Sequence, residues 1–359
     1  MKKLVKILFP FLVVSSVVFS GCKKKNNDDN RILLSFGNMH ATETQELTSL
    51  TELNDLTNNK ESFLLVVNST TCTCWIDFNP VLKSYISKYH VICYQMDFSH
   101  FENSDIASSY GLTTLSRSTT TFAIFEQGAI KTSLNSSKDG NIMYDEKKFE
   151  KYMDETIRLP GCYYVTKDDV ATIKNSQKNA VIYFARSGCG DCKDINPTIL
   201  YSYIKNHKDM NKIYVLDIQP YWKAKDDPNY DSYVNTKIEL GMAEDNNPTF
   251  GYNLGTDKGV VPFFSYIENG NYASGAVVYN DKVEKVDDQY VITANYYNET
   301  RVPSLEYTDT VLQGKVLSES EVRVNGTRVS WQRESARNAY QPILNSFFDY
   351  ALPKVTFSF

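Results

Sequence analysis

The sequence has no excess of basic residues, few histidines and few cysteines, and each shortage excludes a class of protein. Its 359 residues carry a formal net charge of −5, which argues against binding to a nucleic-acid backbone. The four histidines form no H-x-x-x-H pattern and the chain has a single C-x-x-C, so a four-ligand zinc site lacks partners. Seven cysteines are too few for a small disulfide-held scaffold. We therefore expect no metal, no cofactor and no nucleic-acid partner.

Only the N-terminus is apolar enough to enter a membrane. Three lysines in the first six residues precede an apolar run over residues 7–19, followed by Ser20, Gly21 and Cys22. This is the layout of an export signal. The run is short for a membrane-spanning helix of roughly 20 residues, although an uncleaved anchor remains the alternative.

The small pair before Cys22 resembles the lipobox of bacterial lipoproteins, with Phe19 where that motif usually has leucine. The resemblance implies cleavage after residue 21, a lipid on Cys22 and an extracytoplasmic protein anchored to the cell membrane. Cleavage removes three lysines and no acid, so the net charge of −5 becomes −8. Residues 22–45 are then the lipidated cysteine and a polar tether.

The rest of the chain contains a repeat. Residues 48–82 and 165–199 align without a gap at the offset of 117 that separates Cys72 from Cys189. Four of their five identities fall in one nine-residue block, which indicates duplication. Each copy runs from an apolar strand through a cysteine turn and a helix to a second strand. This order predicts an α/β fold with a parallel sheet, and the length fits two domains.

The second block, C-G-D-C-K-D-I-N-P at residues 189–197, falls where a strand ends and a helix begins. Unpaired backbone N–H groups at a helix start stabilise a thiolate, so Cys189 should have a lowered pKa and attack disulfides. Cys192 lies one turn along and can resolve the mixed disulfide. A structural disulfide and half of a zinc site remain alternatives.

At this block the sequence resembles the thioredoxin family, whose pattern C-G-x-C-K-x-I-x-P it matches. Residues 261–270, V-P-F-F-S-Y-I-E-N-G, resemble the family's cis-proline loop and the strand after it. The resemblance implies two tandem thioredoxin-like domains, with Cys189 as nucleophile and Cys192 as resolving thiol. Pro262 and the backbone of Val261 would position the substrate.

The second copy departs from the family in two places. Gly188 stands where an aromatic usually precedes the first cysteine, and Tyr183 replaces the buried acid that helps to deprotonate the resolving cysteine. Asp191 should disfavour the Cys189 thiolate, whereas Arg186 should favour it.

The first copy is altered at the cysteine block. Cys72 is in register with Cys189, but Trp75 occupies the resolving position and Cys74 falls one residue early. Thr120 replaces the proline. Three interpretations stay open: a second redox site, a degenerate copy used for binding or dimerisation, and a metal or cofactor contact. Cys93 and Cys162 fall in buried-strand patterns and are expected to pack as small apolar residues.

We expect a first domain over residues 46–160 and a second over residues 161–359. The second domain carries insertions near residues 220–255 and 271–330; the later one is expected to add β-hairpins before a final helix near 334–350.

The expected function is that of a membrane-anchored extracytoplasmic thiol–disulfide oxidoreductase acting on exported proteins or on a membrane thiol–disulfide transporter. The direction of electron flow stays open, because Asp191 favours a reductase or isomerase and the oxidising compartment favours an oxidase. A non-catalytic surface lipoprotein, with thioredoxin-like scaffolds that bind a partner and a structural Cys189–Cys192 disulfide, is the alternative.

Overall fold

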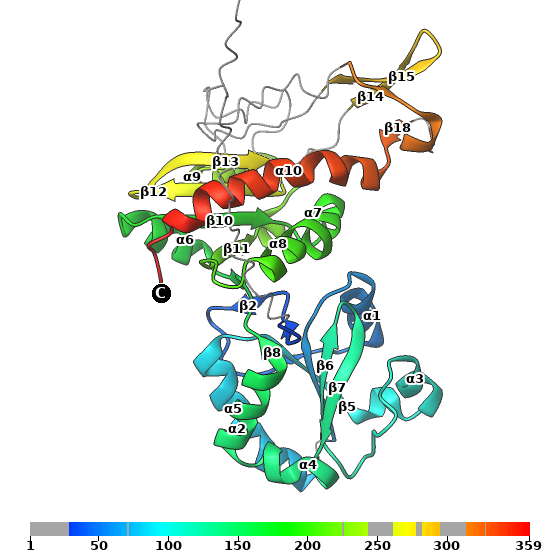
Figure 1. Ribbon diagram of the computed structural model, residues 1–359, viewed down its shortest axis with the longest axis vertical. Helices are drawn as coiled ribbons and strands as arrows, with labels where there is room; N and C mark the ends of the chain where they lie inside the picture. Colours follow the sequence, from blue (N-terminus) through cyan, green and yellow to red (C-terminus); the bar gives the residue numbers. More distant parts are fainter. Residues whose placement is uncertain are drawn as a thin grey trace, which may run out of the picture. The chain divides into compact units, whose positions relative to one another are not determined.

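A computed structural model describes residues 29–69, 72–224, 226–242, 261–277, 282–294, 314–326 and 328–359 (Figure 1). The expected signal at residues 1–21 and the lipidated Cys22 lie outside these ranges, as do parts of both expected insertions. Export and lipid attachment therefore stay predictions. Within the described residues no helix is long and apolar enough to cross a membrane.

The first module is a five-stranded sheet with helices on both faces. Its strand order is β3-β5-β4-β6-β7. The strands β3, β5 and β4 are parallel to one another, and β6 pairs antiparallel with both β4 and β7. The strands are β3 (Gln45–Glu46), β4 (Leu64–Asn68), β5 (Cys93–Asp97), β6 (Thr121–Glu126) and β7 (Ala129–Asn135). The helices are α1 (Leu50–Asn58), α2 (Thr73–Tyr89), α3 (Ser104–Ser109), α4 (Ser136–Met143) and α5 (Glu146–Thr156).

The second module repeats this order as β9-β11-β10-β12-β13. The short strand β2 (Gly37–Asn38) is added at the edge beside β9. Its strands are β9 (Cys162–Tyr164), β10 (Ala180–Ala185), β11 (Ile213–Asp217), β12 (Phe263–Glu268) and β13 (Asn271–Val277). Its helices are α6 (Lys167–Asn175), α7 (Gly190–Ile195), α8 (Tyr201–Asn206), α9 (Tyr230–Glu239) and α10 (Arg333–Ala351). The predicted α/β fold is thereby confirmed, with the same strand order in two tandem modules.

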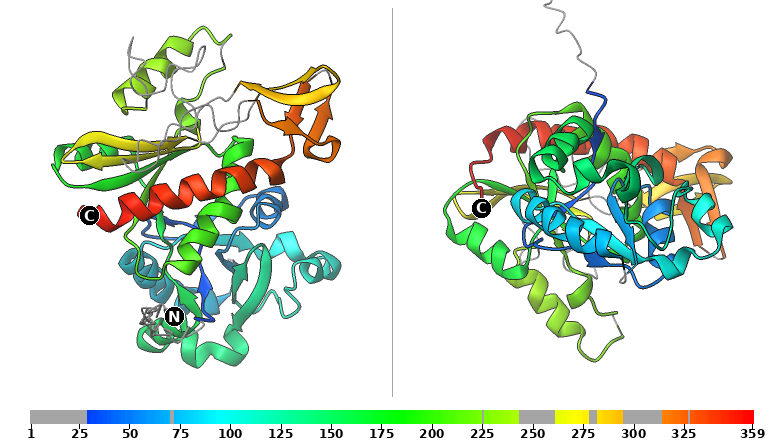
Figure 2. Two further views of the ribbon diagram at one scale, coloured as in Figure 1. Left: turned by 45° about the horizontal axis from the view of Figure 1, so that its top comes forward. Right: turned by 90° about the horizontal axis from the view of Figure 1, so that it is seen from below.

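The central strand of each sheet is buried on both faces, which explains its continuous apolar run. Along β10, Val181, Tyr183 and Ala185 face one hydrophobic cluster, and the alternate residues face another. The helix α10 supplies Phe347 and Phe348 to the same cluster as Tyr183. Consequently α10 runs along the face of the sheet on which the cysteine helix also packs (Figures 1 and 2).

Residues 31–45, predicted to be part of the polar tether of residues 22–45, form part of the fold. The short strand β1 (Ile32–Leu33) pairs with β8 (Ile157–Arg158), and β2 joins the sheet of the second module. The side chains of Ile32, Leu33 and Leu34 are buried. This apolar run explains why the segment enters the fold instead of remaining a polar linker.

The described parts of the second module's insertions add a helix and two hairpins. The helix α9 lies in the first insertion. In the second, β14 (Lys282–Val286) pairs with β15 (Gln289–Ala294), which also pairs with β16 (Val316–Leu317); β17 (Val322–Asn325) pairs with β18 (Arg328–Trp331). The predicted hairpins and the predicted final helix, seen as α10, are confirmed.

Candidate active site

Cys189 caps the start of the helix that follows β10. Its backbone is extended, with φ −86° and ψ 124°, and its sulfur accepts a hydrogen bond from the backbone N–H of Cys192 at 3.4 Å. Both cysteines are present as thiols, with 6% and 2% of their surface exposed. The turn thus aims backbone donors at the Cys189 sulfur, where they stabilise negative charge.

The two sulfurs are set apart by their pKa values. The Cys192 thiol and the backbone N–H groups of Cys192 and Asp191 donate to Cys189, and the pKa of Cys189 falls to about 7. Burial and the Asp191 charge act in the opposite direction. Burial and the neighbouring Cys189 hold the pKa of Cys192 well above its usual value. Cys189 is therefore the sulfur that ionises first.

The backbone of Val261, the residue before Pro262, lies against the Cys189 sulfur. The Val261–Pro262 peptide bond is cis, and the Val261 carbonyl oxygen lies 3.7 Å from Cys189 Sγ. Pro262 is buried, and β12 begins at the next residue and pairs with β10. The pairing of these two strands brings together groups that are 72 residues apart in the sequence.

A segment after β11 holds the cysteine loop and was not identified from the sequence. The side-chain oxygen of Gln219 accepts from the Gly188 N–H at 3.1 Å and from Arg186 at 3.4 Å. The Arg186 guanidinium also lies 4.6 Å from the Trp222 ring centre. Because these contacts join loops about 30 residues apart, no local pattern in the sequence announces them.

The C-terminal helix α10 also reaches the cysteine helix. Arg337 pairs with Asp194 at 2.8 Å, and Arg333 donates to the Gly190 carbonyl oxygen at 3.0 Å. Both contacts span 143 residues of sequence. The last helix thus fixes the first turn after Cys189 from outside.

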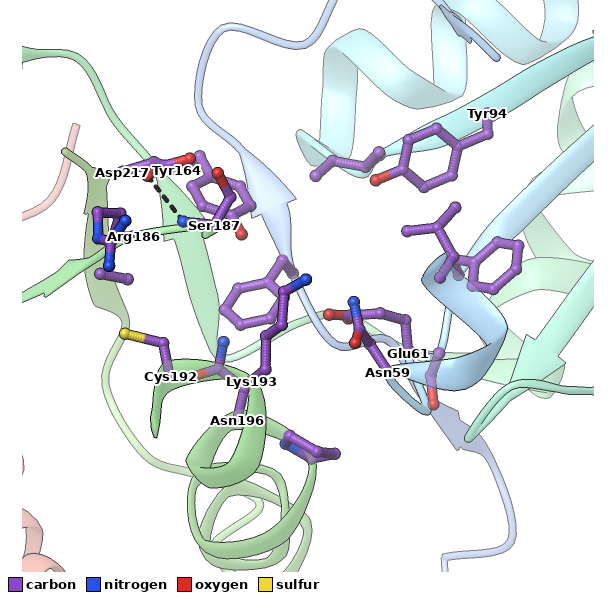
Figure 3. A pocket seen from close by; sticks show the side chains of 17 residues that line it. Asn59, Glu61, Tyr94, Tyr164, Arg186, Ser187, Cys192, Lys193, Asn196 and Asp217 are labelled. Atoms are coloured by element: carbon purple, nitrogen blue, oxygen red, sulfur yellow. Dashed lines mark hydrogen bonds between the residues drawn. The ribbon is translucent and has the colours of Figure 1, made fainter. Parts of the chain in front are cut away.

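A cavity of about 190 Å³ lies beside Cys192 (Figure 3). Cys192, Lys193 and Asn196 line one side of it, and Asn59 and Glu61 line the other. Burial raises the pKa of Glu61 to about 7. The cavity therefore places polar side chains next to the less accessible of the two thiols.

The first module has a different arrangement at the equivalent place. Cys72 caps α2 and forms a disulfide with Cys74, the two Cα atoms being 5.2 Å apart. Cys74 Sγ lies 3.3 Å from Thr120 Oγ1, so Thr120 is brought to the position that Pro262 holds in the second module. Trp75 packs edge-on against Phe78, with ring centres 6.5 Å apart.

The remaining described cysteines are remote from these two blocks. Cys93 and Cys162 are completely buried in β5 and β9, and burial raises the pKa of each thiol. In the described part of the chain no group of three or more His, Cys, Asp or Glu side chains is arranged to hold a metal ion.

Comparisons with known proteins give matches at the level of solved structures only. No family model and no curated protein matches the sequence. Mitochondrial thioredoxin 3 from Saccharomyces cerevisiae is 20% identical over 31% of this chain and 94% of its own, with a TM-score of 0.24. Thioredoxin O2 from Arabidopsis thaliana is 14% identical over 34% of this chain and 99% of its own, with a TM-score of 0.26. Human ERp44 is 14% identical over 49% of this chain and 45% of its own, with a TM-score of 0.25. The fold assignment therefore rests on the strand order of the two sheets.

Proposed function

We propose that this protein is a thiol–disulfide oxidoreductase whose reaction takes place at Cys189 and Cys192. The observation that carries the proposal is the position of the Cys189 sulfur. It caps a helix, has a pKa of about 7 and lies 3.7 Å from the carbonyl oxygen that precedes the cis proline. A thiol that is half ionised near pH 7 is close to the optimum for an attacking sulfur.

The reaction proceeds in two exchanges. The Cys189 thiolate attacks one sulfur of a substrate disulfide, so a mixed disulfide forms and the other substrate sulfur leaves as a thiolate. Cys192 then loses its proton and attacks Cys189, which releases the second substrate thiolate and leaves the Cys189–Cys192 pair oxidised. Run in reverse, the same steps transfer a disulfide to a dithiol substrate. The reduction potential of the pair, relative to those of its redox partners, decides which direction operates in the cell.

The substrates we propose are exported proteins, or a membrane thiol–disulfide transporter that recharges the pair. An extended substrate chain would hydrogen-bond to the Val261 backbone beside Cys189, as a peptide adds to a sheet edge. The proposed setting is the outer side of the cell membrane, with the protein anchored through a lipid on Cys22. Replacement of Cys22 by serine is then expected to abolish lipid labelling and to release the protein from membranes. Tight retention without lipid would instead indicate a transmembrane anchor.

Trapping tests the chemistry directly. The Cys192→Ser variant is expected to accumulate mixed disulfides with client proteins through Cys189, because the resolving thiol is gone. The Cys189→Ser/Cys192→Ser variant is the matched control and is expected to trap nothing. Mixed disulfides that persist in the control, or preferential alkylation of Cys192 over Cys189 near pH 7 after reduction, would overturn the assignment.

The competing proposal is a non-catalytic binding module with a structural Cys189–Cys192 disulfide. The lowered pKa of Cys189 favours exchange over this alternative. A pair that stays oxidised in a glutathione buffer poised below about −300 mV would favour the binding module.

A further inference from the structure

Tyr183 lies directly behind the cysteine helix, at the centre of β10. Its side chain is fully buried, and its ring stacks on Phe264 with a centre-to-centre distance of 4.2 Å. Its hydroxyl donates to Asn196 Oδ1 at 2.8 Å. Asn196 follows Cys192 by four residues, so the two lie on the same face of the helix, one turn apart.

The same hydroxyl also lies close to Cys192, where hydrogen bonding from it lowers the pKa of that thiol against the larger, opposite effect of burial. A phenol has one proton to donate. The hydroxyl can therefore serve Asn196 or Cys192, but not both at once. While Cys192 is a thiol, the hydroxyl stays hydrogen-bonded to Asn196. The Cys192 thiolate would compete for that hydrogen bond with a full negative charge.

We propose that Tyr183 is a positioning residue for the second exchange, in which its O–H turns from Asn196 Oδ1 to the Cys192 sulfur as that thiol ionises. The inference rests on the proposed function, because it concerns the step that resolves the mixed disulfide. The Cys192 proton passes to water or buffer base, and Tyr183 keeps its own proton throughout. The Cys192 electron pair then forms the bond to Cys189, and the substrate sulfur leaves with the pair from the broken bond.

The first module shows what the site looks like without this hydroxyl. Val66 stands at the position of Tyr183: each pairs with the phenylalanine two residues beyond the loop residue that lies against the cysteines. Asn79 stands at the position of Asn196, and its Oδ1 is buried with no hydrogen-bond partner among the described residues. Trp75 replaces the resolving cysteine. The hydroxyl and the resolving thiol are thus present together in one module and absent together in the other.

The surroundings of Tyr183 make its hydroxyl a hydrogen-bond donor to Cys192, not a base that removes the Cys192 proton. Burial raises the pKa of Tyr183 well above its usual value, so it holds its proton at neutral pH. In the mixed disulfide Cys189 carries no charge, and burial of Cys192 is then opposed by donors from Tyr183 and the Arg186 backbone. The other charged or titratable groups that line the cavity beside Cys192 are Glu61, Tyr94, Tyr164, Lys193, Asp217 and the Arg186 guanidinium.

The test compares two tyrosine-to-phenylalanine changes. Tyr183→Phe removes the hydroxyl and keeps the ring. Tyr214→Phe is the matched control, because Tyr214 is equally buried on the neighbouring strand and its hydroxyl donates to the Phe357 carbonyl oxygen at 3.2 Å, away from the cysteines. Both are made with Cys189→Ser, which imitates the uncharged sulfur of the mixed disulfide. Ionisation of Cys192 is followed by NMR of ¹³Cβ-labelled cysteine as a function of pH.

We expect Tyr183→Phe to raise the midpoint of Cys192 ionisation by about one pH unit, a tenfold loss of thiolate at neutral pH, and Tyr214→Phe to leave it unchanged. Asn196→Ala should lower the midpoint, because it frees the hydroxyl from its competing acceptor. Opposite shifts from two neighbouring deletions are not expected of residues that only support the fold. Equal midpoints for the Tyr183→Phe and Tyr214→Phe proteins, or a raised midpoint in Asn196→Ala, would overturn the inference.

Kinetics give a second readout in the protein with both cysteines. Resolution of a preformed mixed disulfide should slow about threefold in Tyr183→Phe, less than the loss of thiolate, because a more basic thiolate is also a better nucleophile. Alkylation of Cys189 should change less than about twofold, since its donors are untouched. If the protein showed no exchange at all, the proposed function would fail while the NMR midpoints still decided the role of Tyr183. Resolution at the unaltered rate would contradict the role.

Discussion

In both modules a cysteine stands at the start of the equivalent helix, but the residues around that cysteine differ. Cys72 caps α2 and is bonded to Cys74, whereas Cys189 caps α7 and faces Cys192 one turn along. The common fold supplies a helix start behind a buried strand in both cases. The difference teaches that the scaffold places a cysteine at the helix start, while the residues two and three positions further on decide what chemistry that cysteine can do.

The two cysteine helices also differ in the ion pair formed by an aspartate that both contain. In the second module Asp194 is paired with Arg337 of α10. Its counterpart Asp77 is exposed and forms no ion pair within the described ranges. At this position the second module ties its cysteine helix to α10, whereas α2 of the first module is tied further along, where Lys88 pairs with Glu150 of α5. Four predictions sharpen or break this contrast, from the largest expected effect to the smallest.

Removal of either cysteine pair should have unequal consequences. Cys189→Ala/Cys192→Ala is expected to reduce the rate of insulin reduction by more than about 100-fold, because nucleophile and resolving thiol are both lost. Cys72→Ala/Cys74→Ala should retain a substantial part of the rate. The comparison breaks if the first module's pair proves to be the essential one.

Reactivity of Cys189 should follow its lowered pKa. At pH 7 about half of a thiol with a pKa of about 7 is ionised, against about 1% of a thiol at the reference value of 9.0. We therefore expect alkylation of Cys189 in the reduced, folded protein to be some tens of times faster than in the unfolded chain at pH 7, falling tenfold per unit below pH 6. Mass spectrometry of labelled peptides measures this. Cys93 and Cys162 are the internal controls and should stay unlabelled; a midpoint near 9 for Cys189 would contradict the site geometry.

The equivalent asparagines should respond oppositely to an apolar replacement. Asn196→Leu leaves the buried Tyr183 hydroxyl without its acceptor and should lower the free energy of unfolding by about 1–3 kcal/mol. Asn79→Leu removes a buried oxygen that has no partner among the described residues, so it should be neutral or stabilising. Urea unfolding of the two variants decides, and equal destabilisation would show that the two sites are alike.

The ion pair to α10 should have a smaller effect. Arg337→Ala is expected to lower the free energy of unfolding by about 1 kcal/mol, because Asp194 and Arg337 are both largely shielded from water. Asp77→Ala, at the exposed counterpart of Asp194, should change the free energy of unfolding by less than about 0.5 kcal/mol. Thermal unfolding of both variants gives the comparison, and a larger loss for Asp77→Ala would reverse it.

The sequence predicts those parts of the site that lie in one segment or match a family pattern. Cys189 and Cys192 were predicted from their place between a strand and a helix, and Pro262 from the resemblance to the thioredoxin family. The repeated strand, turn and helix predicted the parallel strands of each sheet. The hydrogen bond from Tyr183 to Asn196, the arginines of α10 and the Gln219 contact to Gly188 were not predicted, because they join elements whose packing is set only in the folded chain. The same holds for Ile32 and its neighbours, which enter the fold through a strand far along the sequence.

The account's central claim is that disulfide exchange takes place at Cys189–Cys192 and does not need the first module's cysteines. The most direct test is to equilibrate the Cys72→Ala/Cys74→Ala protein with glutathione buffers of graded potential and to quantify the oxidised Cys189–Cys192 peptide by mass spectrometry. We predict a reversible transition between dithiol and disulfide at a defined potential, identical from either starting state. A pair that remains in its starting state across all buffers would contradict the claim.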